Sequence, residues 1–388
     1  MSFSSCDQLE IILKTAEKCN INCTYCYFFN GGDESFKRHP KYISDRTVDE
    51  LALFLEQACS EMSIQKVLID FHGGEPLLQK KHSFKRMCEV FVKKLDKITN
   101  LSFSVQTNGI LIDNEWIDLF SQFHVNIGVS LDGPKDLNDL MRKDHKGRGT
   151  YDDVVAGLRL LVSAAKSGKI NKPGILSVIN NEYPFPMEIY QHFVENLEIE
   201  WVDFLLPDFT HDTFPIAHKG QYSNFLSTIF QAWTTQDNPN IDIRFFNDHL
   251  KKFLRKVDND TSDLAKEKLN SVILTIASNG DLSPADTYRL IDPALMQTGY
   301  NIAHTTLKKF LHHEFFIKLS IAENTLPNAC VGCEWQNICK GGDLVHRYKK
   351  STEFNNPSVF CDDFKIFFPQ MKNYLIQGGV SEELIKNI

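Results

Sequence analysis

The sequence predicts an α/β fold built on a mainly parallel sheet. From Leu9 to about Pro207, short apolar runs alternate with amphipathic stretches. Apolar runs separated by helical patterns indicate βαβ units, and successive units produce a parallel sheet. In barrels made of such units, reactive groups gather on the loops that follow the strands. The first apolar run leads directly into a cysteine-rich loop, which makes that loop the first candidate for function.

Six apolar runs are the predicted strands, and five amphipathic stretches are the predicted helices. The strands are expected at 9–15, 66–73, 101–108, 125–133, 174–179 and 201–207, and the helices near 46–62, 79–98, 113–122, 150–167 and 186–197. Residues 1–207 therefore form the predicted sheet domain. We expect a helical linker region at 208–270, a domain with a second cysteine set at 271–365, and a C-terminal helix at 366–388.

Composition excludes several classes of protein. The chain has 388 residues, of which 42% are hydrophobic and 24% charged, as in ordinary globular proteins. No apolar run approaches the roughly 20 residues that span a bilayer, and the N-terminus lacks a signal peptide, so we expect a cytoplasmic protein without a membrane partner. The net charge of −8 argues against a nucleic-acid partner. In a reducing compartment, ten cysteines favour metal ligation over disulfides.

The run KCNINCTYCYF holds three cysteines, Cys19, Cys23 and Cys26, with Tyr25 before the third. Cysteine thiolate is the usual ligand of a [4Fe–4S] cluster, and three thiolates leave one of its four irons open for a substrate or cofactor. A structural zinc site would need a fourth ligand. The remaining alternative is a chance group of buried free cysteines.

This motif resembles that of the radical S-adenosylmethionine (SAM) enzymes. The resemblance implies a partial (β/α)6 barrel, a SAM-binding [4Fe–4S] cluster, SAM chelated to the open iron, and an external one-electron reductant. It also implies that Gly73, Gly74 and Glu75 in FHGGEP hold the methionine amino group of SAM. Taken alone, GGEP is also typical of a strand-to-helix turn.

Further SAM contacts are implied at the ends of two later strands. Ser130 in SLDGP and Arg142 in MRKDHKG stand where similar enzymes contact the SAM carboxylate, and Asn108 in QTNG lines the same cavity. For Asn108 and the glycine after it, a tight turn is the alternative. Tyr25 completes the implied cofactor-binding set.

A second set of cysteines comprises Cys330, Cys333, Cys339 and Cys361. Four thiolates can complete either an iron–sulfur cluster or a structural zinc site, and the first motif favours iron–sulfur. The pattern resembles the SPASM extension of peptide-modifying radical SAM enzymes, which usually carries two auxiliary clusters. Here Ala285 and Asp343 stand where that pattern has cysteines. We therefore expect a reduced, SPASM-like C-terminal iron–sulfur extension with one auxiliary [4Fe–4S] cluster.

Asp286, in SPADTYR, keeps the position of an aspartate that acts as a base in the related sulfatase-maturating enzymes. A general base suits radical oxidation, because the substrate radical must lose a proton as well as an electron. An aspartate that stabilises a turn is the alternative interpretation.

The opening CDQLEIILKTAEKCNINCTYCYFFN, the run FHGGEPLL and the region CKGGD look most like the cyclophane-forming peptide maturases. That resemblance implies a ribosomally made precursor peptide with a leader sequence, in which an aromatic ring carbon is joined to a side-chain Cβ. The alternatives are an anaerobic, formylglycine-forming sulfatase-maturating enzyme and a non-catalytic iron–sulfur peptide-binding protein.

Overall fold

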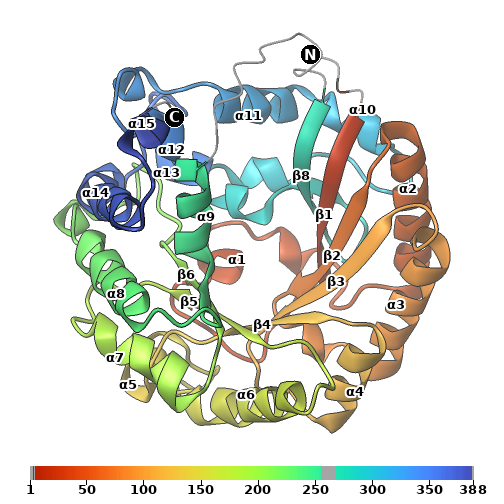
Figure 1. Cartoon of the computed structure of the whole chain (residues 1–388). Helices are drawn as coiled ribbons and strands as arrows, with labels where there is room; N and C mark the ends of the chain where they lie inside the picture. Colours follow the sequence, from red (N-terminus) through yellow and green to blue (C-terminus); the bar gives the residue numbers. More distant parts are fainter. Residues whose placement is uncertain (1–2, 4, 255–267, 387–388) are drawn as a thin grey trace. The chain divides into compact units, whose positions relative to one another are not determined.

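The computed structural model describes residue 3 and residues 5–254 and 268–386 (Figure 1). The chain packs into two compact units. The first contains residues 1–131, 135–174 and 261–317, and the second contains residues 132–134, 175–260 and 318–388. The two packing units do not test the functional segments predicted from the sequence, so those segments stay predictions. Within the predicted linker region, residues 255–267 lie outside the described residues.

The first unit alternates strands and helices along most of its length. Its elements are β1 (Ser5–Ala16), α1 (Tyr27–Asn30), α2 (Asp45–Met62), β2 (Lys66–Gly73), α3 (Lys81–Leu95), β3 (Asn100–Thr107), α4 (Asn114–Gln122), β4 (Asn126–Ser130), α5 (Lys135–Met141), α6 (Tyr151–Lys166), β8 (Lys268–Ile276), β9 (Leu282–Pro284), the 3₁₀ helix η5 (Asp286–Leu290) and α10 (Leu307–Leu311). Helix α11 (Glu314–Asn324) leads on into the second unit.

The second unit is mainly helical. Its elements are β5 (Gly174–Val178), α7 (Pro186–Gln191), β6 (Trp201–Leu205), α8 (Tyr222–Gln236), β7 (Asp242–Ile243), α9 (Arg244–Leu254), α12 (Gln336–Cys339), α13 (Leu344–Arg347), α14 (Cys361–Gln377) and α15 (Glu382–Lys386). No helix in the described parts of the chain is long and apolar enough to cross a membrane.

The predicted α/β class with a mostly parallel sheet is confirmed. In the first unit the strands are neighbours in the order β4-β3-β2-β1-β8-β9, and in the second in the order β7-β6-β5. The first five strands of the first unit pair in parallel, and only β9 runs antiparallel to its neighbour. Neither run of strands closes on itself, so the sheet is open, as a partial barrel requires.

All six predicted strands are present, and their bounds agree within a few residues. The sequence did not predict β8 or β9. Residues 268–276 fall where the linker region was expected to give way to the second cysteine domain, and nothing in their local pattern indicates that they pair with β1. The C-terminal helix α14 begins at Cys361, five residues before the predicted start.

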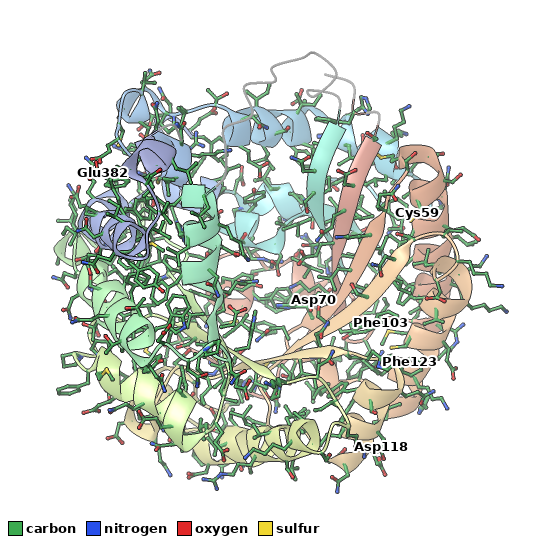
Figure 2. All side chains as sticks on the ribbon, in the orientation of Figure 1. Cys59, Asp70, Phe103, Asp118, Phe123 and Glu382 are labelled. Atoms are coloured by element: carbon green, nitrogen blue, oxygen red, sulfur yellow. The ribbon has the colours of Figure 1, made fainter. Side chains whose placement is uncertain are left out.

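The two faces of β2 differ, and this difference positions the candidate site. Val67, Ile69 and Phe71 are buried, and the Phe71 ring lies 4.6 Å from Phe84 of α3. Alternate residues of a strand point to opposite faces, so Asp70 and the other even-numbered residues face away from the helices. Figure 2 labels Asp70 on this strand.

Replacing Phe71 by Ala should lower the free energy of unfolding by about 3–5 kcal/mol, because it opens a cavity between the sheet and α3. Denaturant unfolding measures the change. Leu53→Ala is the matched control, since Leu53 lies on α2 with 54% of its surface exposed. Equal losses in the two variants would contradict this assignment of the core.

Candidate functional site

The three N-terminal cysteines lie in one loop between β1 and α1. The amide of Cys26 donates to the carbonyl of Cys23 at 3.1 Å, and the Asn30 side chain donates to the same carbonyl at 2.9 Å. Burial raises the pKa of Cys19 to about 12, so the apoprotein disfavours its thiolate. A bound metal group would have to offset that penalty.

Backbone bonds to residues 141–143 hold this loop in place. The amide of Asn22 donates to the carbonyl of Lys143 at 2.7 Å, and that of Thr24 donates to the carbonyl of Met141 at 2.9 Å. The segment containing Arg142 therefore supports the cysteine loop directly. The Arg142 guanidinium also donates to the Tyr25 hydroxyl at 2.8 Å, which links two of the predicted cofactor-binding residues.

Gly73 and Gly74 allow the end of β2 to approach the chain that enters the loop. The Gly74 amide donates to the carbonyl of Ala16 at 2.8 Å. A Cβ atom at Gly73 would lie 2.2 Å from that carbonyl oxygen, and one at Gly74 would lie 2.3 Å from the carbonyl oxygen of Lys18. No neighbour can yield here, because both contacts are with backbone atoms. In this structure the glycines serve the protein's own backbone.

Glu75 is fully buried and joins β2 to the end of β3. Its carboxylate accepts hydrogen bonds from the Leu77 amide at 2.9 Å, the Thr107 hydroxyl at 2.7 Å and the Asn108 amide at 2.7 Å. Burial raises the pKa of Glu75, and these bonds oppose that rise. Because a carboxylate has about four acceptor positions, three internal bonds leave room for one further donor.

Asn108 and Ser130 extend this polar group. The side-chain amide of Asn108 donates to the side chain of Asn20 at 2.7 Å and lies 3.7 Å from the Cys19 sulfur, so it orients the cysteine loop. Ser130 accepts from Gln106 at 2.8 Å. The first unit thus connects the cysteine loop with Tyr25, Gly73, Gly74, Glu75, Asn108 and Arg142, and Ser130 lies at the end of the neighbouring strand β4.

Asp286 is 3% exposed and ion-paired with Lys14 of β1. Its carboxylate also accepts from the Tyr27 hydroxyl at 2.7 Å. Burial alone would raise the pKa of Asp286, but Lys14, His72 and Arg289 outweigh it and hold that pKa well below its usual range. Asp286 is therefore an ionised carboxylate with two fixed donors.

Lys14 has a second partner in His72. The lysine nitrogen lies 3.2 Å from Nδ1 of His72, which also accepts from the Gly73 amide at 2.8 Å. Burial and the charge of Lys14 lower the pKa of His72 to about 4, so the imidazole is neutral at pH 7. Since its Nδ1 accepts, its proton lies on Nε2.

A second buried ion pair lies beside the first. Arg289 pairs with Asp33 at 2.9 Å, and both residues are buried. The centre of the Phe28 ring lies close to both cations, 4.8 Å from the Lys14 nitrogen and 4.5 Å from the Arg289 guanidinium carbon. Each of these cations is thus matched by its own carboxylate.

Sequence reasoning missed Lys14, Tyr27, Asp33 and Arg289. One signal was available: Lys14 is the single basic residue in the apolar run LEIILKT. A lysine there needs a buried partner, although the pattern does not identify which carboxylate provides it.

Asp70 is a further carboxylate on the face of β2 that points away from the helices, which we call the inner face of the sheet. One of its oxygens accepts from the Ser104 hydroxyl at 2.6 Å. Burial raises its pKa from 3.8 to about 7, against the Ser104 hydrogen bond, and the negative charge of Glu10 adds to the rise. Asp70 therefore changes its charge near neutral pH.

The second cysteine set surrounds a hollow in the second unit. Cys330, Cys333, Cys339 and Cys361 line it together with Trp335, Phe364 and Phe368. Burial and the neighbouring thiols raise the pKa of Cys339 to about 12. Again the thiolate form requires a metal group for compensation.

A cluster and a zinc ion require different arrangements of thiolates. Zinc–sulfur bonds of about 2.3 Å bring tetrahedral thiolates within about 4 Å of each other. Among the described residues, no three Cys, His, Asp or Glu side chains are arranged to hold a single metal ion. A cubane attaches each thiolate to a different iron and so accepts a wider arrangement. Four cysteines around a hollow can hold such a cluster.

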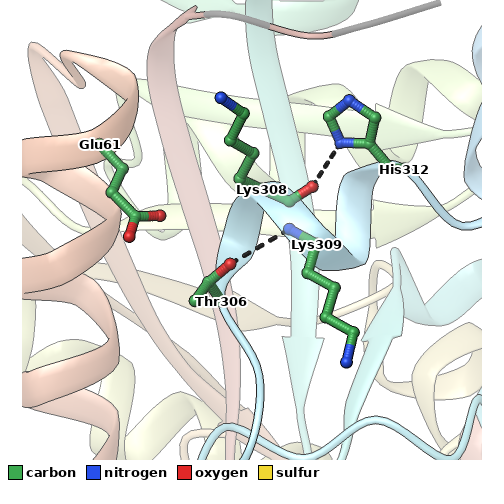
Figure 3. A pocket seen from close by; sticks show the side chains of 5 residues that line it. All are labelled: Glu61, Thr306, Lys308, Lys309 and His312. Atoms are coloured by element: carbon green, nitrogen blue, oxygen red, sulfur yellow. Dashed lines mark hydrogen bonds between the residues drawn. The ribbon is translucent and has the colours of Figure 1, made fainter.

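A separate hollow, shown in Figure 3, contains none of the predicted site residues. Glu61, Thr306, Lys308, Lys309 and His312 line it. Thr306 accepts from the Lys309 amide at 3.2 Å, and the His312 ring lies 2.6 Å from the carbonyl of Lys308. These contacts cap the short helix α10, which accounts for the polar groups there.

Lys14→Met should lower the free energy of unfolding by about 3–5 kcal/mol at pH 8, because it leaves Asp286 buried without its cation. The loss should shrink at acid pH, where the unpaired carboxyl takes up a proton. Denaturant unfolding at the two pH values measures both effects. Lys135→Met, which breaks an exposed pair with Asp152, should cost less than about 1 kcal/mol. A Lys14→Met loss that does not change with pH would contradict the ionised state of Asp286.

Asp70→Asn should stabilise the protein increasingly as pH rises. When folding raises the pKa of an acidic side chain, the protein loses stability as the pH rises from the unfolded-state pKa to the folded-state pKa, here from 3.8 to about 7. From about pH 5.5 to 8.5 the advantage of the variant should grow by about 2 kcal/mol. Denaturant unfolding across this range tests it, and a constant difference would contradict the raised pKa.

Comparison with known proteins bears on this arrangement. Residues 13–182 match the model of the radical SAM superfamily. Over 378 residues the chain is 28% identical to a cysteine-type anaerobic sulfatase-maturating enzyme of Clostridium perfringens, covering 93% of this chain and 95% of that protein. A serine-type anaerobic sulfatase-maturating enzyme of Bacteroides thetaiotaomicron is 25% identical, with coverage of 92% and 87%.

A solved structure shares the fold. Native anSMEcpe with bound AdoMet and Cp18Cys peptide superposes with a TM-score of 0.76 at 23% identity, covering 95% of this chain and 99% of that one. The radical SAM part of the sequence prediction is confirmed. The prediction of cyclophane formation, and with it of carbon–carbon bond formation, is wrong, because full-length relatives are sulfatase-maturating enzymes.

The open, mostly parallel sheet, the cysteine loop after its first strand and the matching family model lead to one conclusion. Residues 13–182 form a radical SAM domain.

Proposed function

We propose that this chain is a peptide-modifying radical SAM enzyme of the anaerobic sulfatase-maturating type, which oxidises a cysteine or serine side chain of a protein substrate to formylglycine. The observation that carries the proposal is the similarity to enzymes of both types over more than nine-tenths of the chain. The charged group around Asp286 supports it, because this oxidation needs a fixed proton acceptor.

The proposal assigns the first unit to the cofactor. Cys19, Cys23 and Cys26 would hold the [4Fe–4S] cluster. The residues that would hold SAM are Tyr25, Gly73, Gly74, Glu75, Asn108, Ser130 and Arg142. When bound, SAM on its cluster supplies hydrogen-atom abstraction, with the electron coming from an external reductant, and an auxiliary cluster supplies electron acceptance. Glu75, with one acceptor position left, suits the ammonium group of SAM, whose charge would offset the burial of this carboxylate.

The substrate must lose two hydrogens, and every proton and electron that leaves with them must have an acceptor. One leaves the side-chain carbon as a hydrogen atom, and the other leaves the thiol or hydroxyl as a proton while one electron departs. A serine then becomes the aldehyde directly, and a cysteine becomes a thioaldehyde that water converts to the aldehyde with release of hydrogen sulfide. Asp286 is the proposed proton acceptor, since Lys14 and Tyr27 keep it ionised and oriented.

The second unit would hold the electron acceptor through Cys330, Cys333, Cys339 and Cys361. The absence of cysteine at positions 285 and 343 supports one auxiliary cluster and a total of two. A leader sequence in the substrate, inferred with the cyclophane interpretation, stays an untested prediction.

Mass spectrometry of a peptide substrate tests the reaction. Protein reconstituted with iron and sulfide, given SAM and a reductant without oxygen, should make the Cp18Cys peptide lighter by about 18 mass units and its serine version lighter by about two. The control is Cys19→Ala/Cys23→Ala/Cys26→Ala, which should cleave no SAM. SAM cleavage with both peptides and no change in mass would overturn the proposed function.

Asp286→Asn should retain SAM cleavage and SAM binding while lowering formylglycine yield by about 10²–10⁴-fold, the usual contribution of a positioned base. Asp153→Asn, an exposed change at the start of α6, is the matched control and should leave the yield unchanged. If the Asp286 variant gives normal yield, the proton acceptor lies elsewhere. If SAM cleavage is lost as well, Asp286 has a structural role.

A further inference from the structure

Four side chains lie in one row across the inner face of the first unit's sheet. Asp70 of β2 aligns with Ser104 of β3 on one side and with Ile12 of β1 on the other, and Ile12 aligns with Thr275 of β8. Aligned residues of neighbouring parallel strands point to the same face. We call Ser104, Asp70, Ile12 and Thr275 the inner row.

The inner row lies one step below the proposed reaction site. Lys14 and His72 follow Ile12 and Asp70 by two residues on the same strands and the same face, toward the strand ends. A two-residue step along a strand is about 6.6 Å. Ile12, Asp70 and Ser104 are each partly exposed, whereas the neighbouring residues on the opposite face are buried against helices. Three residues of the inner row therefore keep some accessible surface beside the proposed reaction site, and Thr275 is buried next to them.

Thr275 carries a polar atom without a protein partner. It is 3% exposed, and its hydroxyl forms no hydrogen bond with any residue that the structure describes. A buried hydroxyl left unpaired costs about 1–3 kcal/mol. Such a group beside partly exposed residues indicates a polar ligand that completes it.

Among the described residues, Asp70 has no cation as an ion-pair partner of its own. Lys14 is committed to Asp286, and Arg289 to Asp33. The charged groups that act on Asp70 are Glu10 and Asp286, which disfavour its ionised form, and Lys14, which favours it. Within the described parts of the chain, its hydrogen bond comes from Ser104 and engages one of its oxygens. A positive ligand would relieve this excess of negative charge.

We propose that the inner row is a substrate subsite that receives a cationic side chain, an ammonium or guanidinium, from the peptide that the reaction site modifies. This inference rests on the proposed function and names a specificity determinant for it. Asp70 accepts hydrogen bonds from the cation, and Ser104 fixes the orientation of the carboxylate. Ile12 contacts the methylene stem of the bound side chain, as apolar surfaces do for long basic residues.

Thr275 completes the subsite at its far end. Asp70 and Thr275 are two strands apart, a distance of about 10 Å. An extended basic side chain spans most of that distance, so its charged head reaches Asp70 while the polar groups near its backbone reach the Thr275 hydroxyl. A short or neutral side chain cannot satisfy both ends.

Calorimetric titration with N-butylguanidinium tests the charged end without SAM, reductant or turnover. The wild-type holoprotein should bind this probe, and the neutral isostere N-butylurea should bind at least about tenfold more weakly. Asp70→Asn should lower the affinity for the cation about tenfold and leave that for the urea unchanged. Ser102→Ala is the matched control, because Ser102 lies on the same strand, two residues before Ser104. Equal affinity in wild type and Asp70→Asn, or no binding of the cation at all, would overturn the proposal.

Turnover distinguishes this subsite from the proposed function itself. In a series of cysteine-containing peptides that each carry one lysine or arginine at a different position, replacing that residue by Gln should raise the KM about tenfold for one position in wild type and leave it unchanged in Asp70→Asn. Thr275→Val should raise the KM of every peptide and leave the binding of N-butylguanidinium intact. SAM cleavage without peptide should be the same in all these proteins. If peptide oxidation fails while N-butylguanidinium binding still depends on Asp70, the subsite stands and the formylglycine assignment falls.

Discussion

The buried ion pair between Lys14 and Asp286 is the interaction on which the candidate site depends. It joins the first strand to the segment after β9, and the two residues stand 272 positions apart in the chain. Two charges without water are stable only when each compensates the other and further hydrogen bonds complete them. Tyr27, His72 and the neighbouring Arg289–Asp33 pair provide that completion, so the segment carrying Asp286 has one favourable position against the sheet.

The fold could be predicted wherever the signal is local. Strands β1 to β6 alternate with amphipathic helices, and that alternation determines both their existence and their parallel pairing. Strand β8 could not be found in this way, because its neighbour β1 lies at the other end of the chain and its own run, KLNSVILTI, has no βαβ context that could be recognised. Pairing between two strands that lie far apart in the sequence produces no periodic pattern of residues within either strand.

The candidate site shows the same limit. Cys19, Cys23, Cys26 and Glu75 stand in contiguous motifs and were predicted as a group. Lys14 acquires its meaning only from a carboxylate far along the chain. The error about the reaction has a related cause. The motifs compared were those that hold the shared cofactor, whereas the choice of substrate depends on side chains such as those of the inner row, which stand singly on separate strands.

The Arg142–Tyr25 bond joins side chains of the cysteine loop and of residues 141–143, and two further hydrogen bonds between these segments use only backbone amides and carbonyls. Hydrogen bonds of this kind do not depend on which side chains the participating residues carry. The outer surface of the loop is therefore free to diverge between relatives while the three sulfur atoms keep their positions. Divergent sequences can in this way retain one radical chemistry and still present different surfaces to electron donors, which need only approach the loop from outside.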